Sequence, residues 1–171
     1  MRTAPSPSGK ADAGRHGMTE IRAIRPAKPD DISRVAEIFV FNYRLNFYPI
    51  FRNDGFYFRE LRVPEMMEMF RTQIDTLWVY DDGAVKGFVQ AQDGEVKRLF
   101  VEPVLQGQSI GAKLIEYAAL NLGAHGLWAL EKNTRAIAFY ERHGFFPTGE
   151  RKPEEDTDEY LVRLERKPQY T

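Results

Sequence analysis

The hydrophobic pattern of this chain changes repeatedly between a period of two and a period of about 3.6 residues, and this change constrains the fold most. Strand-like stretches are predicted at residues 21–24, 77–80, 85–91, 95–101 and 127–130, with two terminal strands completing the chain. Helix-like stretches are predicted at residues 32–43, 64–73, 109–122 and 134–143. The order βααβββαβαββ predicts an α/β (α+β) fold in which helices cover a mixed sheet.

Turn and capping residues support these boundaries. Residues 29–31, Pro-Asp-Asp, place a proline and two acidic groups at the start of the first helix. Residues 81–83, Asp-Asp-Gly, predict a hairpin between the second and third strands. Gly144 is suited to end the fourth helix. The strand and helix boundaries are therefore marked at several independent points.

The chain has 171 residues, which suits one domain, and residues 19–171 carry all of the periodic pattern. Residues 1–18 are rich in Ala, Pro, Ser and Gly and lack that pattern. We expect them to form a disordered leader, either a cloning remnant or an extension from an upstream start codon. Met18 is then the candidate native initiator.

Composition excludes several classes of protein. The formal net charge is -1, without the basic excess of a dedicated nucleic-acid binder. Cysteine is absent, which excludes disulfides, thiolate metal sites and a cysteine nucleophile. No apolar run approaches the roughly 20 residues of a membrane span, and residues 1–18 lack the apolar core of a secretory signal. A cytoplasmic protein without nucleic-acid or membrane partners is expected.

Residues 99–111, Leu-Phe-Val-Glu-Pro-Val-Leu-Gln-Gly-Gln-Ser-Ile-Gly, join a strand to a helix through a turn of small residues. Such a turn can direct backbone N–H groups at an anion bound to the helix N-terminus. Gly107 and Gly111 would let a pyrophosphate approach the main chain. The alternative is a tight strand-to-helix connection. No Gly-Lys-Ser/Thr follows and no three-glycine fingerprint is present, which excludes a P-loop and a dinucleotide-binding turn.

This segment resembles the acetyl-CoA signature of the GNAT superfamily, the GCN5-related N-acetyltransferases. The signature reads Gln or Arg, two residues, Gly, any residue, then Gly or Ala. Gln106, Ser109 and Gly111 occupy its fixed positions, with Ser109 where glycine is usual. Serine is small and a good helix cap, so we expect the departure to be mild.

Residues 133–145 resemble the second cofactor motif of the same superfamily, in which an asparagine faces the pantetheine arm and a tyrosine approaches the thioester sulfur. Here these residues are Asn133 and Tyr140, about two helical turns apart. The resemblance extends over residues 20–165. It implies the GNAT fold, with a mixed, mostly antiparallel sheet flanked by helices, and acetyl-CoA as the acyl donor.

The resemblance also implies which residues bind acetyl-CoA. The fourth strand would pair its backbone with the pantetheine and donate an N–H to the thioester oxygen. The turn and the helix after it would hold the pyrophosphate. The implied cofactor-binding residues are Leu99, Phe100, Val101, Gln106, Gly107, Gln108, Ser109, Ile110, Gly111, Ala112, Asn133 and Tyr140.

Acid–base roles follow from the family's direct transfer of an acetyl group to an amine. Tyr140 is the candidate general acid for the leaving thiolate, and the alternative is a core tyrosine. Many members carry the basic carboxylate at the position of Lys97. Alternation along the strand puts Glu95 on the same face, so Glu95 is the candidate base, and the alternative is a solvated carboxylate. Glu102 is a weaker candidate.

Two clusters bear on the acceptor. Residues 39–58 contain nine aromatic side chains, which either form one wall of an acceptor pocket or pack beneath a long loop. Residues 154–159 form an acidic run that could attract a cationic acceptor, although a solvated turn is the preferred interpretation. His16, His125 and His143 lack zinc-ligand spacing, so no metal is expected.

The leading hypothesis is a single-domain, acetyl-CoA-dependent N-acetyltransferase acting on a primary amine of a small molecule or peptide. One alternative is a GNAT-fold regulatory module that binds CoA without turnover, for which the lysine at position 97 and Ser109 argue. Another is a transferase of a different acyl group. A homodimer is left open.

Overall fold

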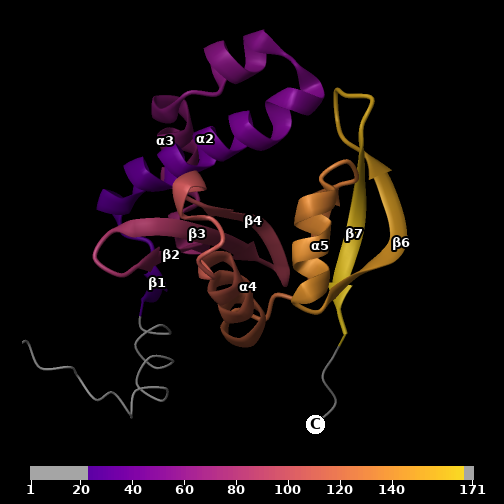
Figure 1. Cartoon of the computed structure of the whole chain (residues 1–171). Helices are drawn as coiled ribbons and strands as arrows, with labels where there is room; N and C mark the ends of the chain where they lie inside the picture. The colour runs from indigo at the N-terminus through magenta and orange to yellow at the C-terminus, as the bar shows by residue number, and fades with distance from the viewer. Residues whose placement is uncertain (1–22, 168–171) are drawn as a thin grey trace, which may run out of the picture.

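The structure is a computed structural model that describes residues 23–167 (Figure 1). The expected leader, residues 1–18, lies outside the described residues, so the boundary at residue 19 stays a prediction. The same holds for residues 21 and 22 of the first expected strand.

The described elements follow the predicted order once short 3-10 and π-helical turns are set aside. They are β1 (Ile24–Pro26), η1 (Pro29–Asp31), α2 (Ile32–Phe51), η2 (Phe56–Glu60), α3 (Val63–Thr72), η3 (Ile74–Thr76), β2 (Leu77–Asp81), β3 (Val85–Gln92), β4 (Glu95–Val101), η4 (Pro103–Leu105), α4 (Ile110–Asn121), β5 (Gly126–Leu130), α5 (Thr134–Arg142), β6 (Phe145–Pro153) and β7 (Tyr160–Arg166). The first strand extends beyond its predicted end, because Ile24 and Pro26 pair with Tyr80 and Trp78 on β2. Helix α2 likewise continues two turns past the predicted pattern.

The seven strands form one sheet in the order β1-β2-β3-β4-β5-β7-β6. Every neighbouring pair is antiparallel except β4 and β5, which are parallel. The predicted mixed, mostly antiparallel sheet is therefore confirmed.

Strands β4 and β5 separate soon after they begin. Their register contains only two pairs, Glu95 with Gly126 and Val96 with Leu127, although both strands continue for several more residues. A strand edge without a neighbour leaves backbone N–H and C=O groups free to bind something else. The divergence opens a gap in the middle of the sheet.

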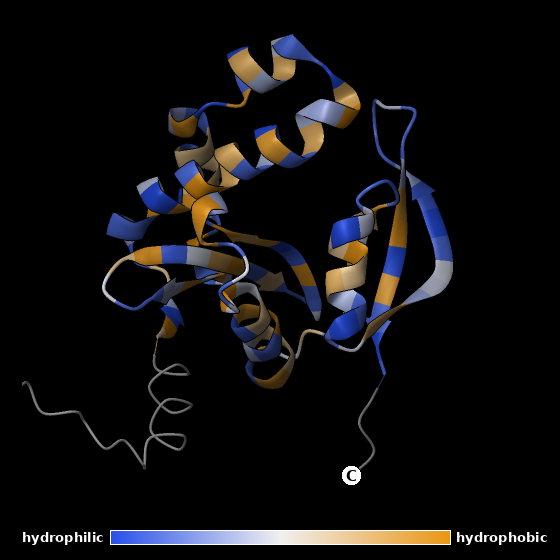
Figure 2. Cartoon of the chain, viewed as in Figure 1, coloured by the Kyte–Doolittle hydropathy of each residue, from blue (hydrophilic) through white to orange (hydrophobic). Residues whose placement is uncertain are grey.

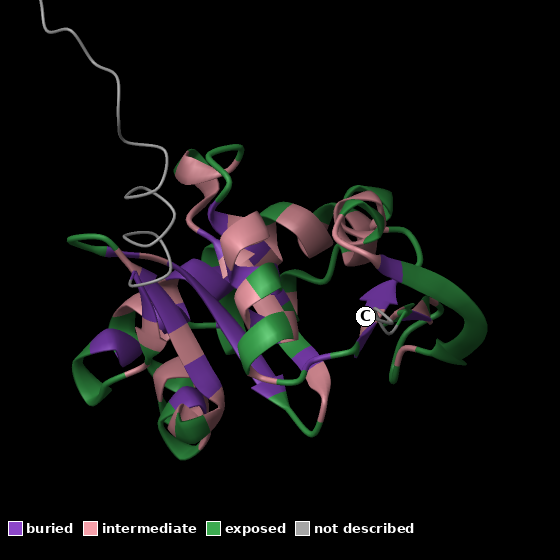
Figure 3. Cartoon of the chain, turned by 90° about the horizontal axis from the view of Figure 1, so that it is seen from below, coloured by how far each residue is buried: buried purple, intermediate pink, exposed green. Residues whose placement is uncertain are grey.

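Helices cover the two faces of this sheet and bury two hydrophobic clusters (Figures 1 and 2). Helices α2 and α3 cover one face around Phe39, Phe70 and Phe88, and α4 and α5 cover the other around Leu114 and Phe145. Figure 3 shows the buried strands at the centre and the exposed β6 at one edge. The gap between β4 and β5 therefore lies between the layer of α2 and α3 and the layer of α4 and α5.

Candidate active site

A cavity of about 1100 Å³ occupies this gap. Pockets for one drug-sized ligand usually have roughly 300–1,000 Å³, so this cavity lies just beyond the upper end of that range and can hold a large ligand. Its lining comes from α2, η2, the C-terminal half of β4, the start of α4, β5, α5 and the turn between β6 and β7. We name the two parts of the cavity after the acyl donor and the amine acceptor that the resemblance implies. The part beside β4, α4 and α5 is the donor end. The part beside α2, η2 and the β6–β7 turn is the acceptor end.

Backbone groups of β4 face the donor end. The backbone N–H of Glu102 donates to the carbonyl of Lys86, which places the backbone groups of Glu102 on the β3 side. Because these groups alternate along an antiparallel ladder, those of Val101 and Leu99 point toward the gap. The Val101 carbonyl there accepts from Asn42 Nδ2 at 2.9 Å. The Leu99 N–H is thus directed into the cavity.

The turn before α4 has a backbone shape that the sequence motif alone does not show. Gly107 has φ +84° and Ser109 has φ +66°, both in the left-handed region that favours glycine. Ser109 is the N-cap residue of α4, yet its side chain makes no capping hydrogen bond. The expectation that Ser109 acts as a good cap is therefore wrong, because the left-handed backbone replaces the extended conformation that a serine cap requires.

Gly111 lies at the start of α4, beside Phe139 of α5. A Cβ atom at this position would lie 3.4 Å from Cζ of Phe139, an ordinary contact distance, so the site has room for alanine but not for a long side chain. The first N–H groups of α4 have no partner within the helix and can bind an anion. Gln108 is exposed and lies outside the cavity lining, whereas every other implied cofactor-binding residue lines it.

Asn42 connects the donor end to α2 and was missed by sequence reasoning. This side chain is only 1% exposed, and its Nδ2 donates to the carbonyls of Ile38 and Val101. Its Oδ1 accepts from Gln106 Nε2 at 3.1 Å. Gln106 is therefore held against the end of β4. An asparagine within an apolar helical stripe was the available signal, because a buried amide needs partners.

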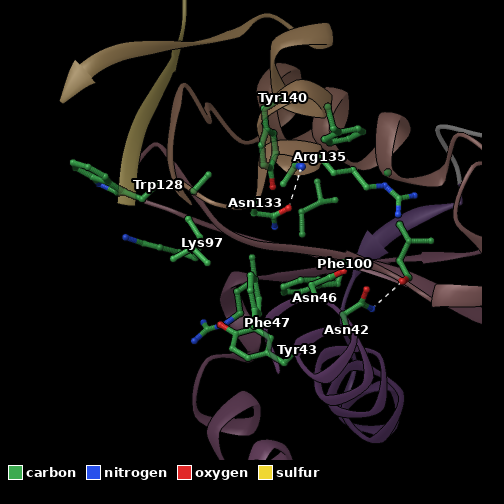
Figure 4. Close-up of a pocket in the computed structure, with 18 of the residues that line it drawn as sticks. Asn42, Tyr43, Asn46, Phe47, Lys97, Phe100, Trp128, Asn133, Arg135 and Tyr140 are labelled. Atoms are coloured by element: carbon green, nitrogen blue, oxygen red, sulfur yellow. Dashed lines mark hydrogen bonds between the residues drawn. The ribbon is translucent and has the colours of Figure 1, made fainter. Parts of the chain in front are cut away.

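Asn133 and Tyr140 lie together on the cavity side of α5, as Figure 4 shows. Asn133 is the N-cap of α5, and its Oδ1 accepts from the backbone N–H of Ala136 at 3.2 Å. The Tyr140 hydroxyl points into the cavity. Burial raises the pKa of this phenol to about 12. The hydroxyl therefore stays protonated at neutral pH and can act as a donor.

The structure does not bring Glu95 to the cavity. Its carboxylate accepts hydrogen bonds from Lys97 at 2.8 Å and from Arg163 at 2.5 Å, and these two cations hold its pKa below the ordinary value. A shift in the β3–β4 register, where Arg98 pairs with Gln90 but Val96 with Ala91, leaves Lys97 as an extra residue. Such a bulge breaks the alternation on which the assignment of Glu95 rested.

Glu102 is also outside the cavity lining, and it accepts from Arg34 at 3.0 Å. Among residues 23–167 there is no group of three or more His, Asp or Glu side chains that could hold a metal ion. Across the same residues no helix is both long and apolar enough to span a membrane.

The acceptor end has an aromatic wall, which consists of Tyr43, Phe47, Phe51, Phe56 and Tyr57. The other aromatic residues of this region do not line the cavity: Phe39 is 3% exposed in the core, whereas Phe41 and Phe58 are 44% and 50% exposed. Five residues of the aromatic cluster therefore form a cavity wall, as the first interpretation predicts, whereas Phe39 has a packing role, as the alternative predicts.

The acidic run also lies partly at the acceptor end. Glu154, Glu155 and Asp156, in the turn between β6 and β7, line the cavity together with Thr157. Asp158 and Glu159 do not, and Glu159 accepts from Lys132 at 2.7 Å. Glu155 and Asp156 are exposed and Glu154 is half-buried, as a solvated turn predicts, and the hairpin also brings this tip beside the end of α2, where it lines the cavity (Figure 1).

Comparisons with known proteins agree with this geometry. A family profile described as "Acetyltransferase (GNAT) domain" matches residues 73–147. Peptidyl-lysine N-acetyltransferase YjaB of Salmonella typhimurium is 35% identical over 75 residues, 43% of this chain and 52% of that protein. The match therefore spans about half the length of that relative. IAA acetyltransferase of Azospirillum brasilense is 31% identical over 112 residues, 63% of this chain and 72% of that protein.

Solved structures share the fold at low sequence identity. The apo form of YjaB from Escherichia coli has a TM-score of 0.62 at 21% identity, over 83% of this chain and 95% of that one. PaiA N-acetyltransferase from Thermoplasma acidophilum, solved in complex with coenzyme A, has a TM-score of 0.58 at 16% identity, over 83% and 97% of the two chains.

Proposed function

Because this chain belongs to the GNAT family of N-acetyltransferases, we propose that it transfers an acetyl group from acetyl-CoA directly to a primary amine. One observation carries the proposal. The gap between β4 and β5 presents the Leu99 N–H, which the β3–β4 ladder directs away from β3, and the protonated Tyr140 hydroxyl to a single cavity. A thioester bound in this gap would lie between a hydrogen-bond donor for its oxygen and an acid for its sulfur.

Binding of the donor would use the donor end. Backbone groups around Leu99 would pair with the pantetheine arm, and the free N–H groups at the start of α4 would bind the pyrophosphate. Asn133 would face the pantetheine. CoA or acetyl-CoA appears in the names of similar solved structures, which supports the same donor here.

The chemistry would then proceed in one displacement. The neutral amine attacks the carbonyl carbon, and the Leu99 N–H stabilises the negative charge that develops on the oxygen. The C–S bond breaks as the amide forms, and Tyr140 gives a proton to the departing sulfur. The amine loses one proton to water, and Tyr140 recovers one from water, so the reaction balances. Glu95 has no part in this scheme, because it lies outside the cavity in an ion-pair network.

Release of free thiol from acetyl-CoA in the presence of an amine panel tests the proposal, together with calorimetric binding of acetyl-CoA. Gly111→Glu adds bulk and a negative charge where the pyrophosphate would bind, so the affinity for acetyl-CoA should fall at least about tenfold, or 1.4 kcal/mol. Gly111→Ala is the matched control. Acetyl-CoA binding without thiol release would indicate the regulatory module, and faster turnover of another acyl-CoA would change the donor.

A further inference from the structure

Four carboxylates line the acceptor end without a cationic partner. Glu60, Glu154, Glu155 and Asp156 all line the cavity, and none of them forms an ion pair within residues 23–167. Elsewhere on the same side of the sheet, carboxylates such as Glu159 and Glu131 are paired with Lys132 and Arg151. Glu154 is half-buried and the other three carboxylates are exposed. Solvent therefore screens their mutual repulsion, but the four negative charges still attract a cation to this end.

The charge of Glu154 acts on the aromatic wall. Burial raises the pKa of both Tyr43 and Tyr57, and the negative charge of Glu154 adds to both shifts, although at Tyr43 the positive charge of Arg98 opposes the shift. The acidic turn and the wall thus face each other across the acceptor end. A cation between them would contact carboxylates on one side and aromatic ring faces on the other, and both attract it.

Of the basic side chains that line the cavity, only Arg98 is known to act on the aromatic wall, through Tyr43, and none forms an ion pair with the acidic turn within residues 23–167. Lys97 is paired with Glu95 at 2.8 Å. Arg98 donates to Gln90, and its guanidinium lies over the rings of Phe39 and Phe70 in the aromatic core. The remaining two, Arg135 and Arg142, belong to α5 at the donor end.

The attacking nitrogen itself cannot be the cation that this end recognises. An amine must be neutral when it attacks a thioester, because the protonated form has no free electron pair. The reacting nitrogen would also lie near Leu99 and Tyr140 at the donor end. The unpaired carboxylates therefore select a second positive charge, separated from the reacting amine by a segment that can lie against the aromatic wall.

We propose that the acceptor is a diamine or polyamine, and this inference rests on the proposed function. Such a compound has a small primary amine joined through an apolar chain to a second cationic group. The far cation binds between the acidic turn and the aromatic wall, and the chain contacts Tyr43 and Phe47. The near amine reaches the donor end, where it is acetylated.

Three acceptors of equal chain length test this inference: cadaverine, pentylamine and aminopentanoate, whose far ends are positive, neutral and negative. The kcat/KM for cadaverine should exceed that for pentylamine by at least about tenfold, and aminopentanoate should be the poorest acceptor. Spermidine should also be a good acceptor. Raising the salt concentration should reduce the preference for cadaverine, because salt screens partly exposed charges.

Glu154→Gln is the decisive variant, since it removes the charge that faces the wall and keeps the side-chain shape. The ratio of kcat/KM for cadaverine to that for pentylamine should fall about tenfold. Asp158→Asn is the matched control, because it removes one negative charge from the same turn outside the cavity and should preserve the ratio. Glu155→Gln, in the same turn, provides a second independent variant.

The outcomes separate this inference from the proposed function. Three results would each overturn the acceptor class. They are an equal kcat/KM for the three acceptors, an unchanged cadaverine-to-pentylamine ratio of kcat/KM in both Gln variants, and faster turnover of a lysine blocked at its α-amine and carboxyl group than of cadaverine. Acetyl-CoA binding with no turnover of any diamine would also overturn it. Failure to bind acetyl-CoA would instead contradict the proposed function itself.

Discussion

At the scale of single residues, the surroundings of Tyr140 suit a proton donor. A phenol with a pKa of about 12 is about 1% ionised at pH 10, so it keeps its proton across the range in which amines become neutral. The same burial that disfavours the phenolate makes the proton harder to release. A thiol has an ordinary pKa of about 8.5, so a thiolate is a weaker base than this phenolate, and Tyr140 stabilises the departing sulfur chiefly through the hydrogen bond that its hydroxyl donates while the C–S bond breaks.

Tyr140→Phe removes the hydroxyl and keeps the ring that packs against Phe139 and Phe145. We expect kcat to fall roughly 10- to 100-fold, at the lower end for acid catalysis because a thiolate is already a fair leaving group. The KM for acetyl-CoA should change little. Steady-state kinetics with an acceptor that makes chemistry rate-limiting measure both. Tyr117→Phe on α4, outside the cavity lining, is the control. An unchanged kcat in Tyr140→Phe would mean that the Tyr140 hydroxyl has no part in the reaction and that the residue only packs.

Ser109→Gly tests the left-handed backbone before α4. A non-glycine residue at φ +66° costs on the order of 1–3 kcal/mol, and glycine removes that cost while it adds about 0.5–1 kcal/mol of unfolded-chain entropy. The free energy of unfolding should therefore rise by about 1 kcal/mol, with acetyl-CoA affinity retained. Denaturant titration measures the change. A loss of stability would show that the serine hydroxyl makes an interaction worth more than the strain.

At the scale of elements, α2 serves both ends of the cavity. Its aromatic residues form the wall of the acceptor end, and one turn earlier Asn42 binds the end of β4 and the Gln106 amide. The position of the acceptor wall is therefore coupled to the turn that would bind the donor.

Asn42→Leu keeps the side-chain volume and removes these hydrogen bonds. The Val101 carbonyl and the Gln106 amide lose their partner, and each buried unpaired group costs about 1–3 kcal/mol. We expect a loss of roughly 2–4 kcal/mol in the free energy of unfolding and a larger effect on the KM for acetyl-CoA than on kcat. Asn121→Leu, at the exposed end of α4, is the control. Unchanged stability would mean that the two groups find other partners.

Asp31 joins the start of α2 to β1. Its carboxylate accepts from Arg25 at 2.7 and 3.1 Å and from the Lys28 backbone N–H at 2.8 Å. The hydrogen bonds from Arg25 are the main reason that the pKa of Asp31 lies below its ordinary value, against the opposing effect of burial. A depressed carboxyl pKa stabilises the fold above the unfolded pKa, and this stability is lost as the pH falls through the folded value.

Asp31→Asn should therefore lower the free energy of unfolding by about 1.5–3 kcal/mol at pH 7. The difference from the wild type should shrink as the pH falls below about 4, the ordinary aspartate value. Urea titrations at a series of pH values measure it, with the neighbouring exposed Asp30→Asn as control. A difference independent of pH would assign the effect to packing.

How far the sequence could predict these elements differs from one to the next. Periodicity located every described α-helix and strand, because α2 buries one apolar stripe and β3 is a short, nearly fully buried run between turn residues, but it did not locate the short 3-10 and π-helical turns. It could not locate the bulge at Lys97, because a bulge depends on how β4 pairs with β3. The face of the strand on which Glu95 lies was therefore predicted wrongly. Asn42 was missed for a similar reason: its partners are 59 and 64 residues away.

At the scale of the whole molecule, the gap between β4 and β5 leaves two parts of one sheet joined by two residue pairs. Helices α4 and α5 and the hydrophobic cluster beneath them hold the parts together on one face only. The donor would complete the hydrogen bonding across the gap. Binding should therefore stabilise the native protein as well as supply the acyl group.

Acetyl-CoA at 100 times its Kd should raise the free energy of unfolding by about 2.7 kcal/mol, which corresponds to a Tm increase of roughly 5–11 °C for a chain of this size. Differential scanning calorimetry measures the shift. Hydrogen exchange should slow at Leu99, whose amide faces the gap, more than at Phe100, which already pairs with Phe88 on β3. Slowing at both amides alike would mean that the donor binds elsewhere and only tightens the fold.

The tip of the β6–β7 hairpin has a consequence for how such an enzyme can diverge. Residues 154–158 contribute no buried side chain, yet four of them line the acceptor end. Substitutions there should affect folding little, whereas the donor end is constrained by the buried hydrogen bonds that Asn42 makes with Val101 and Gln106. Lineages could exchange this short tip and acquire new acceptors without rebuilding the catalytic centre. The same five residues are thus the natural place to graft a new specificity in the laboratory.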